Sequence, residues 1–245
     1  MPAALGRAYL LLILEFGGAL WPSCAFAYRP FDSTDPAVAA LGEFEVELSP
    51  VSFRHEDGGT TWIAPQLRLN YGFAHDWEVV LEGQGEYPHH QIGELVENAL
   101  SLKSVLREGS LQDKNGPSIA TELSLLLPGI HSESATGVAI TGIVGQSWAW
   151  GAIHFNAAAE LSRDQRAGIF LGVILEGPGA SKVRPVAEVI YQREFGREEE
   201  VAGLIGLIWQ MKEALAFDFA VRQAGIDGRP ETEIRAGLTF AFPVR

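Results

Sequence analysis

From Glu43 onward, apolar and polar residues alternate with a period of two, in segments of roughly ten residues. In the segment Glu43–Ser49, glutamates alternate with Phe44, Val46 and Leu48. A β-strand directs successive side chains to opposite faces, so this segment predicts a strand with one acidic and one apolar face. A helix would mix the two kinds of residue on every face.

The same alternation predicts further strands along the whole chain. In one of them, Trp77, Val79 and Leu81 oppose Glu78 and Glu82. The twelve predicted strands cover residues 43–49, 66–73, 77–86, 98–107, 118–127, 137–148, 152–161, 167–175, 184–193, 201–211, 214–222 and 232–242. Because turns or polar loops rather than crossovers connect them, neighbouring strands are expected to form antiparallel hairpins.

The connections fall into a tight class and a longer, polar class. Tight connections are expected at 74–76, 149–151 and 212–213, and polar loops at 54–61, 87–96, 162–166, 194–200 and 223–231. An even number of strands returns both ends of the chain to one side, as in single-chain bacterial outer-membrane barrels. The longer loops would then face outward from the cell.

Strands with one apolar face can span a membrane only if the sheet closes, because hydrocarbon offers no partner to backbone groups at an edge. Strand lengths, hairpin connections throughout, and aromatic residues near strand ends, such as Trp62, Trp77 and Trp209, favour such a barrel. The alternative is a soluble β-sandwich or lipocalin-like barrel with its apolar face inside. The predicted fold is an all-β, twelve-stranded antiparallel transmembrane β-barrel of outer-membrane type, in residues 43–245.

Residues 1–27 predict an export signal. Arg7 precedes an apolar run, and the small-x-small sequence that ends at Ala27 places the expected cleavage after that residue. Cys24, the one cysteine of the sequence, lies before the cut. A retained N-terminal anchor or lipidation of Cys24 are the alternatives. Residues 28–42 are then expected to form an N-terminal periplasmic segment, and the protein is expected in the cell outer membrane of a Gram-negative bacterium.

The sequence has 18 basic and 31 acidic residues, a net charge of −13 at pH 7. This charge argues against nucleic acid as a partner. The expected partners are outer-membrane lipids, the barrel-assembly machinery, which commonly recognises an aromatic last strand like that of Phe240 and Phe242, and a small solute if the barrel is a channel. No cofactor is expected.

Two arrangements of side chains are candidates for catalysis or metal binding. An outer-membrane phospholipase would need a serine activated by a histidine. His131 and Ser132 are adjacent, but adjacent residues point apart on a strand and no third residue at a suitable spacing orients the histidine. His89 and His90, with two glutamates nearby, match no established metal-ligand spacing. We therefore expect neither an enzyme nor a metal site.

The charged residues at inward positions are the candidate functional residues. Those predicted to line the lumen are Arg68, Glu78, Glu82, Lys103, Arg107, Glu122, Glu160, Arg184, Glu188, Asp218, Arg222 and Arg235. Barrels of about eight strands are filled by side chains and those of about 16 leave an aqueous channel, so twelve strands predict a narrow, partly plugged lumen.

Three roles are open to this lumen. The charges line a solute path, with the acid excess favouring cations or neutral solutes over anions. Alternatively, they pair across the lumen and stiffen a structural barrel. In the third hypothesis, the outward loops bind a partner and the barrel only displays them.

Four short sequences carry a family resemblance. They are Gly42-Glu43-Phe44-Glu45-Val46-Glu47, Leu69-Asn70-Tyr71-Gly72-Phe73 with a tight turn before Trp77-Glu78, Leu126-Leu127-Pro128-Gly129, and Ala236-Gly237-Leu238-Thr239-Phe240. In order and spacing they resemble the outer-membrane proteins named for the meta-pathway of phenol degradation, over nearly the whole chain after the signal. The resemblance implies a β-barrel transporter of small, hydrophobic or aromatic solutes.

Overall fold

The computed structural model describes residues 29–56 and 58–244, which form thirteen β-strands and one turn of 3-10 helix. The strands are β1 (Glu43–Ser49), β2 (Ser52–Glu56), β3 (Gly59–Ala74), β4 (Trp77–Pro88), β5 (Glu94–Arg107), β6 (Ser118–Leu126), β7 (Gly137–Trp148), β8 (Gly151–Leu161), β9 (Ala167–Glu176), β10 (Val183–Glu194), β11 (Glu198–Lys212), β12 (Leu215–Ile226) and β13 (Arg229–Pro243), with the helical turn η1 (Ser110–Gln112) between β5 and β6. The expected signal and its cleavage lie outside the described residues. No helix in this part of the chain is long and apolar enough to cross a membrane.

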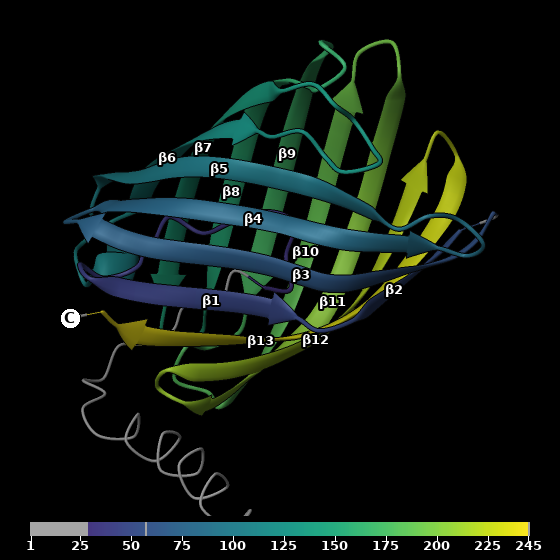
Figure 1. Ribbon diagram of the computed structural model, residues 1–245. Helices are drawn as coiled ribbons and strands as arrows, with labels where there is room; N and C mark the ends of the chain where they lie inside the picture. The colour runs from purple at the N-terminus through teal and green to yellow at the C-terminus, as the bar shows by residue number, and fades with distance from the viewer. Residues whose placement is uncertain (1–28, 57, 245) are drawn as a thin grey trace, which may run out of the picture.

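The strands form one sheet that closes on itself (Figure 1). From β3 to β13 each strand pairs antiparallel with the next strand in the chain, and β1 and β2 both pair with β13 on one side and β3 on the other. Pro50 and Val51 interrupt what is otherwise one strand, so the thirteen segments make twelve barrel strands. The predicted twelve-stranded closed antiparallel barrel is confirmed.

The polar faces of the strands point inward and the apolar faces outward. Glu78 and Lys103 are fully buried inside, whereas Leu123 and Ile205 on the outer face are 56% and 70% exposed. A soluble barrel would show the opposite distribution. The inverted arrangement is that of a barrel that exposes an apolar band to lipid, and it contradicts the soluble alternative.

The strands extend further than the alternation predicts. Most of the expected loops 54–61, 87–96 and 223–231 belong to paired strands, and β12 and β13 remain paired up to the turn at Asp227 and Gly228. These two residues have φ angles of 49° and 78°, as a two-residue hairpin turn that matches strand twist requires. The loop prediction was wrong because both faces of a strand become polar beyond the apolar band, which removes the alternation but not the pairing.

Residues 29–42, which we call the lumen segment, run inside the barrel (Figure 1). The segment joins β1 at one end of the barrel, where the N–H of Gly42 donates to the carbonyl of Gly72 at 2.7 Å. The periplasmic location predicted for residues 28–42 is therefore wrong for the described part of that segment. Because the segment has no hydrophobic period, nothing in its sequence indicates that its charged residues have partners on the inner wall.

Candidate functional site

Asp32 of the lumen segment is held by two arginines of the barrel wall. Its carboxylate oxygens lie 2.7 Å from Nε of Arg222 on β12 and 2.6 Å from Nη1 of Arg235 on β13. Burial alone would raise the pKa of this carboxyl, but attraction to Arg235 and Arg222 outweighs burial and lowers the pKa of Asp32 to about 2. The carboxylate is ionised at neutral pH, so an ion pair joins the segment to the wall.

The backbone around Asp32 is fixed by the same part of the wall. Glu188 on β10 accepts hydrogen bonds from the N–H groups of Asp32 and Ser33, at 2.8 and 2.7 Å. Arg235 donates to the carbonyl of Pro30 at 2.8 Å. Hydrogen bonds to charged groups are the stronger kind, so these contacts fix the position of the chain as well as neutralising charge.

A second set of contacts holds the segment nearer to β1. Lys103 Nζ donates to Thr34 Oγ1 at 3.2 Å, and Asn156 donates to the Thr34 carbonyl at 2.8 Å. The Glu78 carboxylate accepts the N–H of Ala39 at 2.7 Å and lies 3.6 Å from Lys103 Nζ. These buried charges therefore serve the lumen segment as well as each other, in agreement with the rule that buried charges are paired.

Inward-facing glycines make room for the lumen segment. The glycines on which the segment lies are Gly72, Gly145, Gly172 and Gly237. A Cβ at Gly72 would collide with the carbonyl oxygens of Ala39 and Ala40, and one at Gly172 with the hydroxyl of Ser33. Glycine in a strand commonly marks such a close approach of another part of the chain.

A cavity of about 590 Å³ lies inside the barrel beside the lumen segment, and residues 29–34 form part of its wall. The cavity reaches Glu86, Glu198 and Glu231, which lie near the hairpin tips at the end of the barrel away from the start of β1. The lumen is thus filled by chain toward one end and hollow toward the other.

More carboxylates than guanidinium groups line the cavity. The eleven acidic residues are Asp32, Glu47, Glu82, Glu86, Glu97, Glu122, Glu160, Glu198, Glu200, Glu231 and Glu233, and the five arginines are Arg29, Arg54, Arg68, Arg222 and Arg235. Arg68 on β3 joins two other strands, because its guanidinium lies 2.8 Å from the carboxylate of Glu82 on β4 and 3.4 Å from that of Glu122 on β6. The acid excess of the whole sequence is therefore present inside the barrel too.

The residues predicted from the sequence divide between the cavity and the lumen segment. Arg68, Glu82, Glu122 and Glu160 line the cavity, Arg222 and Arg235 line it and also contact the segment, and Glu78, Lys103, Glu188 and Asp218 contact the segment. Arg184 lies away from both and pairs with Glu176 at 3.8 Å.

Arg107 departs from the prediction. The pairing of β5 with β6 shifts between Val105 and Arg107, so that Arg107 lies opposite Ile119. Ile119 is on the outer face of β6, and Arg107 is exposed at the end of β5. A β-bulge inserts an extra residue and reverses the face of the residues after it, so the inward position expected for Arg107 is wrong.

Several lining residues were missed from the sequence. Arg29 and Asp32 lie in the segment without periodicity, and Arg54, Glu86 and Glu231 lie in residues expected to be loop or at a strand end. The alternation of Glu231 with later charged residues of β13 was a usable signal. The glycines at inward strand positions were another signal, because a polar inner face has no need of glycine unless another part of the chain lies against it.

The side chains considered for catalysis hold the loop between β6 and β7 in place. His131 Nδ1 lies 3.3 Å from the carbonyl oxygen of Gly93, and Ser132 Oγ donates to the carbonyl of Leu95 at 3.3 Å. Each side chain thus binds the backbone at the start of β5. This geometry gives the serine no activating histidine.

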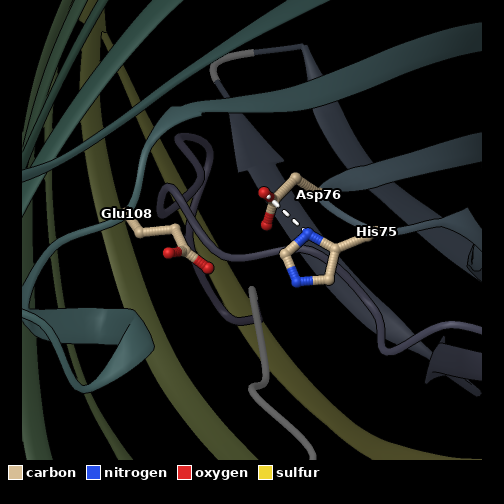
Figure 2. Close-up of side chains that lie close together, drawn as sticks. All are labelled: His75, Asp76 and Glu108. Carbon is tan, nitrogen blue, oxygen red and sulfur yellow. Dashed lines mark ion pairs between the residues drawn. The ribbon is translucent and has the colours of Figure 1, made fainter.

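In the described part of the chain, one cluster of histidine and acids is close enough to hold a metal ion, and it does not contain His89 or His90. It consists of His75 and Asp76, in the turn after β3, and Glu108, just after β5 (Figure 2). The ring of His75 pairs with Asp76 at 2.9 Å and is 79% exposed. The cluster lies outside the lumen, and we assign it no ligand.

No family model matches this sequence, and no curated protein matches it either. Solved structures share its fold. The NanC porin has a TM-score of 0.61 at 8% identity, over 80% of this chain and 98% of that one. An outer membrane channel from Pseudomonas putida F1 has a TM-score of 0.58 at 11% identity, over 86% and 100%. The KdgM porin has a TM-score of 0.56 at 12% identity, over 81% and 99%. By fold, this chain is a closed barrel of the outer-membrane type.

Proposed function

We propose that this protein is an outer-membrane channel for small solutes, narrowed by its own lumen segment. The observation that carries the proposal is the cavity of about 590 Å³ inside a closed barrel. A purely structural barrel has no need of a polar space of this size in its lumen. The lumen segment leaves that space open, and its residues 29–34 form part of the cavity wall.

The fold neighbours support this proposal. They are described as porins and as an outer membrane channel, and one KdgM structure is described as a complex with disordered oligogalacturonate. They also support a location in the outer membrane of a Gram-negative bacterium, reached through the expected signal. In this proposal lipids surround the apolar band, and the barrel-assembly machinery inserts the protein. A solute with hydrophobic or aromatic character is the finer hypothesis, and it rests on the sequence resemblance to the phenol meta-pathway family.

A second candidate is a structural barrel with no transport. Extensive ion pairing in the lumen favours it: Arg222 pairs with Asp32, Glu200 and Glu231 at once. In this alternative the charges hold neighbouring strands to one another and to the lumen segment, which completes the packing.

Electrical recording on refolded protein distinguishes the two. Protein beginning at residue 28 is refolded into detergent, compared on gels before and after heating, and then placed in planar lipid bilayers. A matched variant lacking residues 28–41 is treated in the same way. We expect heat-dependent mobility for both, discrete current steps for the intact protein and larger steps for the variant. Correctly folded protein without current in either form would contradict the channel and leave the structural barrel.

A further inference from the structure

We propose that the cavity admits small organic cations, an ammonium group joined to an apolar part, in preference to anions of the same size. The proposal rests on the proposed channel function and specifies its substrate class. Its first support is the balance of charge in the cavity, eleven carboxylates against five guanidinium groups. Walls of one dominant sign around a narrow space favour permeating ions of the opposite sign.

The positive groups of the cavity are already engaged. Each of its five arginines forms an ion pair with a carboxylate: Arg29 with Asp218, Arg54 with Glu86, Arg68 with Glu82, Arg222 with Glu200, and Arg235 with Glu233. In each pair, a carboxylate of the protein itself already occupies the guanidinium group. A permeating anion would have to compete with these fixed carboxylates.

Three carboxylates of the cavity are not engaged in this way. Glu97 on β5, Glu160 on β8 and Glu198 at the start of β11 line the cavity, and none of these carboxylates has a hydrogen bond or ion pair with a side chain that the structure describes. The positive charge of Arg163 attracts the carboxylates of Glu97 and Glu160. Its guanidinium, however, donates its hydrogen bonds to the carbonyls of Leu127 and Asn98. Glu97 and Glu160 lie within the cavity away from the hairpin tip where Glu198 is exposed, so they are the groups that we expect to receive a cation.

The wall beside Glu160 is apolar. Phe170 on β9 and Ile190 on β10 both line the cavity and pack together with Ala202 and Ala224. Glu160 lies opposite Gly168 in the sheet, two residues before Phe170 on the same face of β9. Diagonal neighbours of this kind are about 7–8 Å apart, so one solute reaches both. An aromatic face and a carboxylate together suit an ammonium ion with an apolar part.

The surroundings of the Asp32 carboxylate agree with this excess of negative charge. Asp32 is bound there by Arg222 and Arg235, but these arginines also pair with Glu200, Glu231 and Glu233. If Asp32 left, three carboxylates would still surround two guanidinium groups. A free anion would therefore enter a site whose net charge is already negative.

Reversal potentials with two probes of permanent charge test the proposal. Benzyltrimethylammonium and benzenesulfonate are similar in size, and each is measured in bilayers against potassium chloride, with the intact protein and with the variant lacking residues 28–41. We expect a permeability severalfold higher for the ammonium probe. The substitution Glu160→Gln should reduce that ratio, whereas Glu213→Gln, an exposed residue in the turn between β11 and β12, should leave it unchanged.

The outcomes separate the two proposals. Current with equal permeability, or with preference for the sulfonate, would overturn the cation proposal and leave the channel standing. A ratio that Glu160→Gln and Glu97→Gln both leave unchanged would also overturn it, because the selective wall would then lie elsewhere. Folded protein without current in any form would overturn the channel and the substrate class with it.

Discussion

At the scale of single residues, the lumen segment is held by few contacts of high strength. Asp32 makes two charge-assisted contacts to the wall, and each bond of that kind contributes about 1.5–3 kcal/mol. Arg222 and Arg235 keep other carboxylate partners when Asp32 is neutralised. Loss of this one charge is therefore expected to loosen the segment without leaving an arginine unpaired.

Thiol labelling measures that loosening. Protein beginning at residue 28 contains no cysteine, so Ser33→Cys supplies a single buried reporter. We expect Asp32→Asn to speed the labelling of this cysteine severalfold at pH 7. Asp164→Asn is the matched control, because Asp164 pairs with Arg197 at an exposed position and does not touch the segment. Equal labelling rates with and without the Asp32 carboxylate would show that other contacts hold the segment.

The inward glycines give a second prediction at this scale. Gly72→Ala places a methyl group against the carbonyls of Ala39 and Ala40, whereas an added Cβ at Gly142, on the outer face, meets its nearest neighbour at 3.9 Å. Overpacking of this kind costs about 1–3 kcal/mol. We expect Gly72→Ala to lower the temperature at which the folded band is lost on a gel, and Gly142→Ala to leave that temperature unchanged or slightly higher. Equal behaviour of the two variants would contradict the close approach at Gly72.

At the scale of elements, aromatic rings mark the seam where the first and last strands meet. Phe44 on β1 stacks on Tyr71 of β3, with the two ring centroids 4.6 Å apart, and its ring centroid lies 6.0 Å from that of Phe242 on β13. Phe44 and Phe242 are also directly paired in the sheet. Because closure joins strands from the two ends of the chain, these rings stabilise the step that completes the barrel.

A double-mutant cycle tests the seam. Phe44→Ala, Phe242→Ala and the double variant are compared by refolding yield and by stability in denaturant. We expect a coupling of about 0.5–1.5 kcal/mol between the two rings, the usual range for aromatic pairs. Phe219→Ala on the outer face of β12 is the control, since Phe219 has no ring partner within the described residues. Additive effects at Phe44 and Phe242 would show that the seam gains nothing from this contact.

Elements with strict alternation could be predicted from the sequence, and others could not. The predicted bounds of β1 and β7 agree with the structure because each has a continuous apolar outer face. Arg107 was misplaced by one bulge that leaves no mark in composition. The pairing of Asp32 with Arg222 joins residues 190 positions apart, and only the closed barrel brings them together. Within the site, the sequence thus predicts to which face of a strand a charged side chain points, but not which residue it pairs with.

At the scale of the whole molecule, the barrel is inverted relative to a soluble protein. Exposed apolar side chains surround it, including Leu81, Leu123, Ile140 and Ile205, while the interior holds ion pairs and a cavity. An apolar band of this extent is stable in hydrocarbon and would cause aggregation in water. The architecture and the charge of the lumen therefore depend on the same alternation.

A charge placed on the band tests that dependence directly. Ile205 lies in the middle of β11 and is 70% exposed, so Ile205→Arg puts a guanidinium near the centre of the bilayer, at a cost of about 2–4 kcal/mol. Gln223→Arg, on the outer face near the end of β12, places the same charge near the interface, where the cost is about 0–1 kcal/mol. Refolding into lipid vesicles of each variant, followed by titration with denaturant, gives the two free energies of unfolding. A loss confined to Ile205→Arg is the result expected of a membrane-spanning band, because in water an exposed arginine is tolerated equally well at both positions.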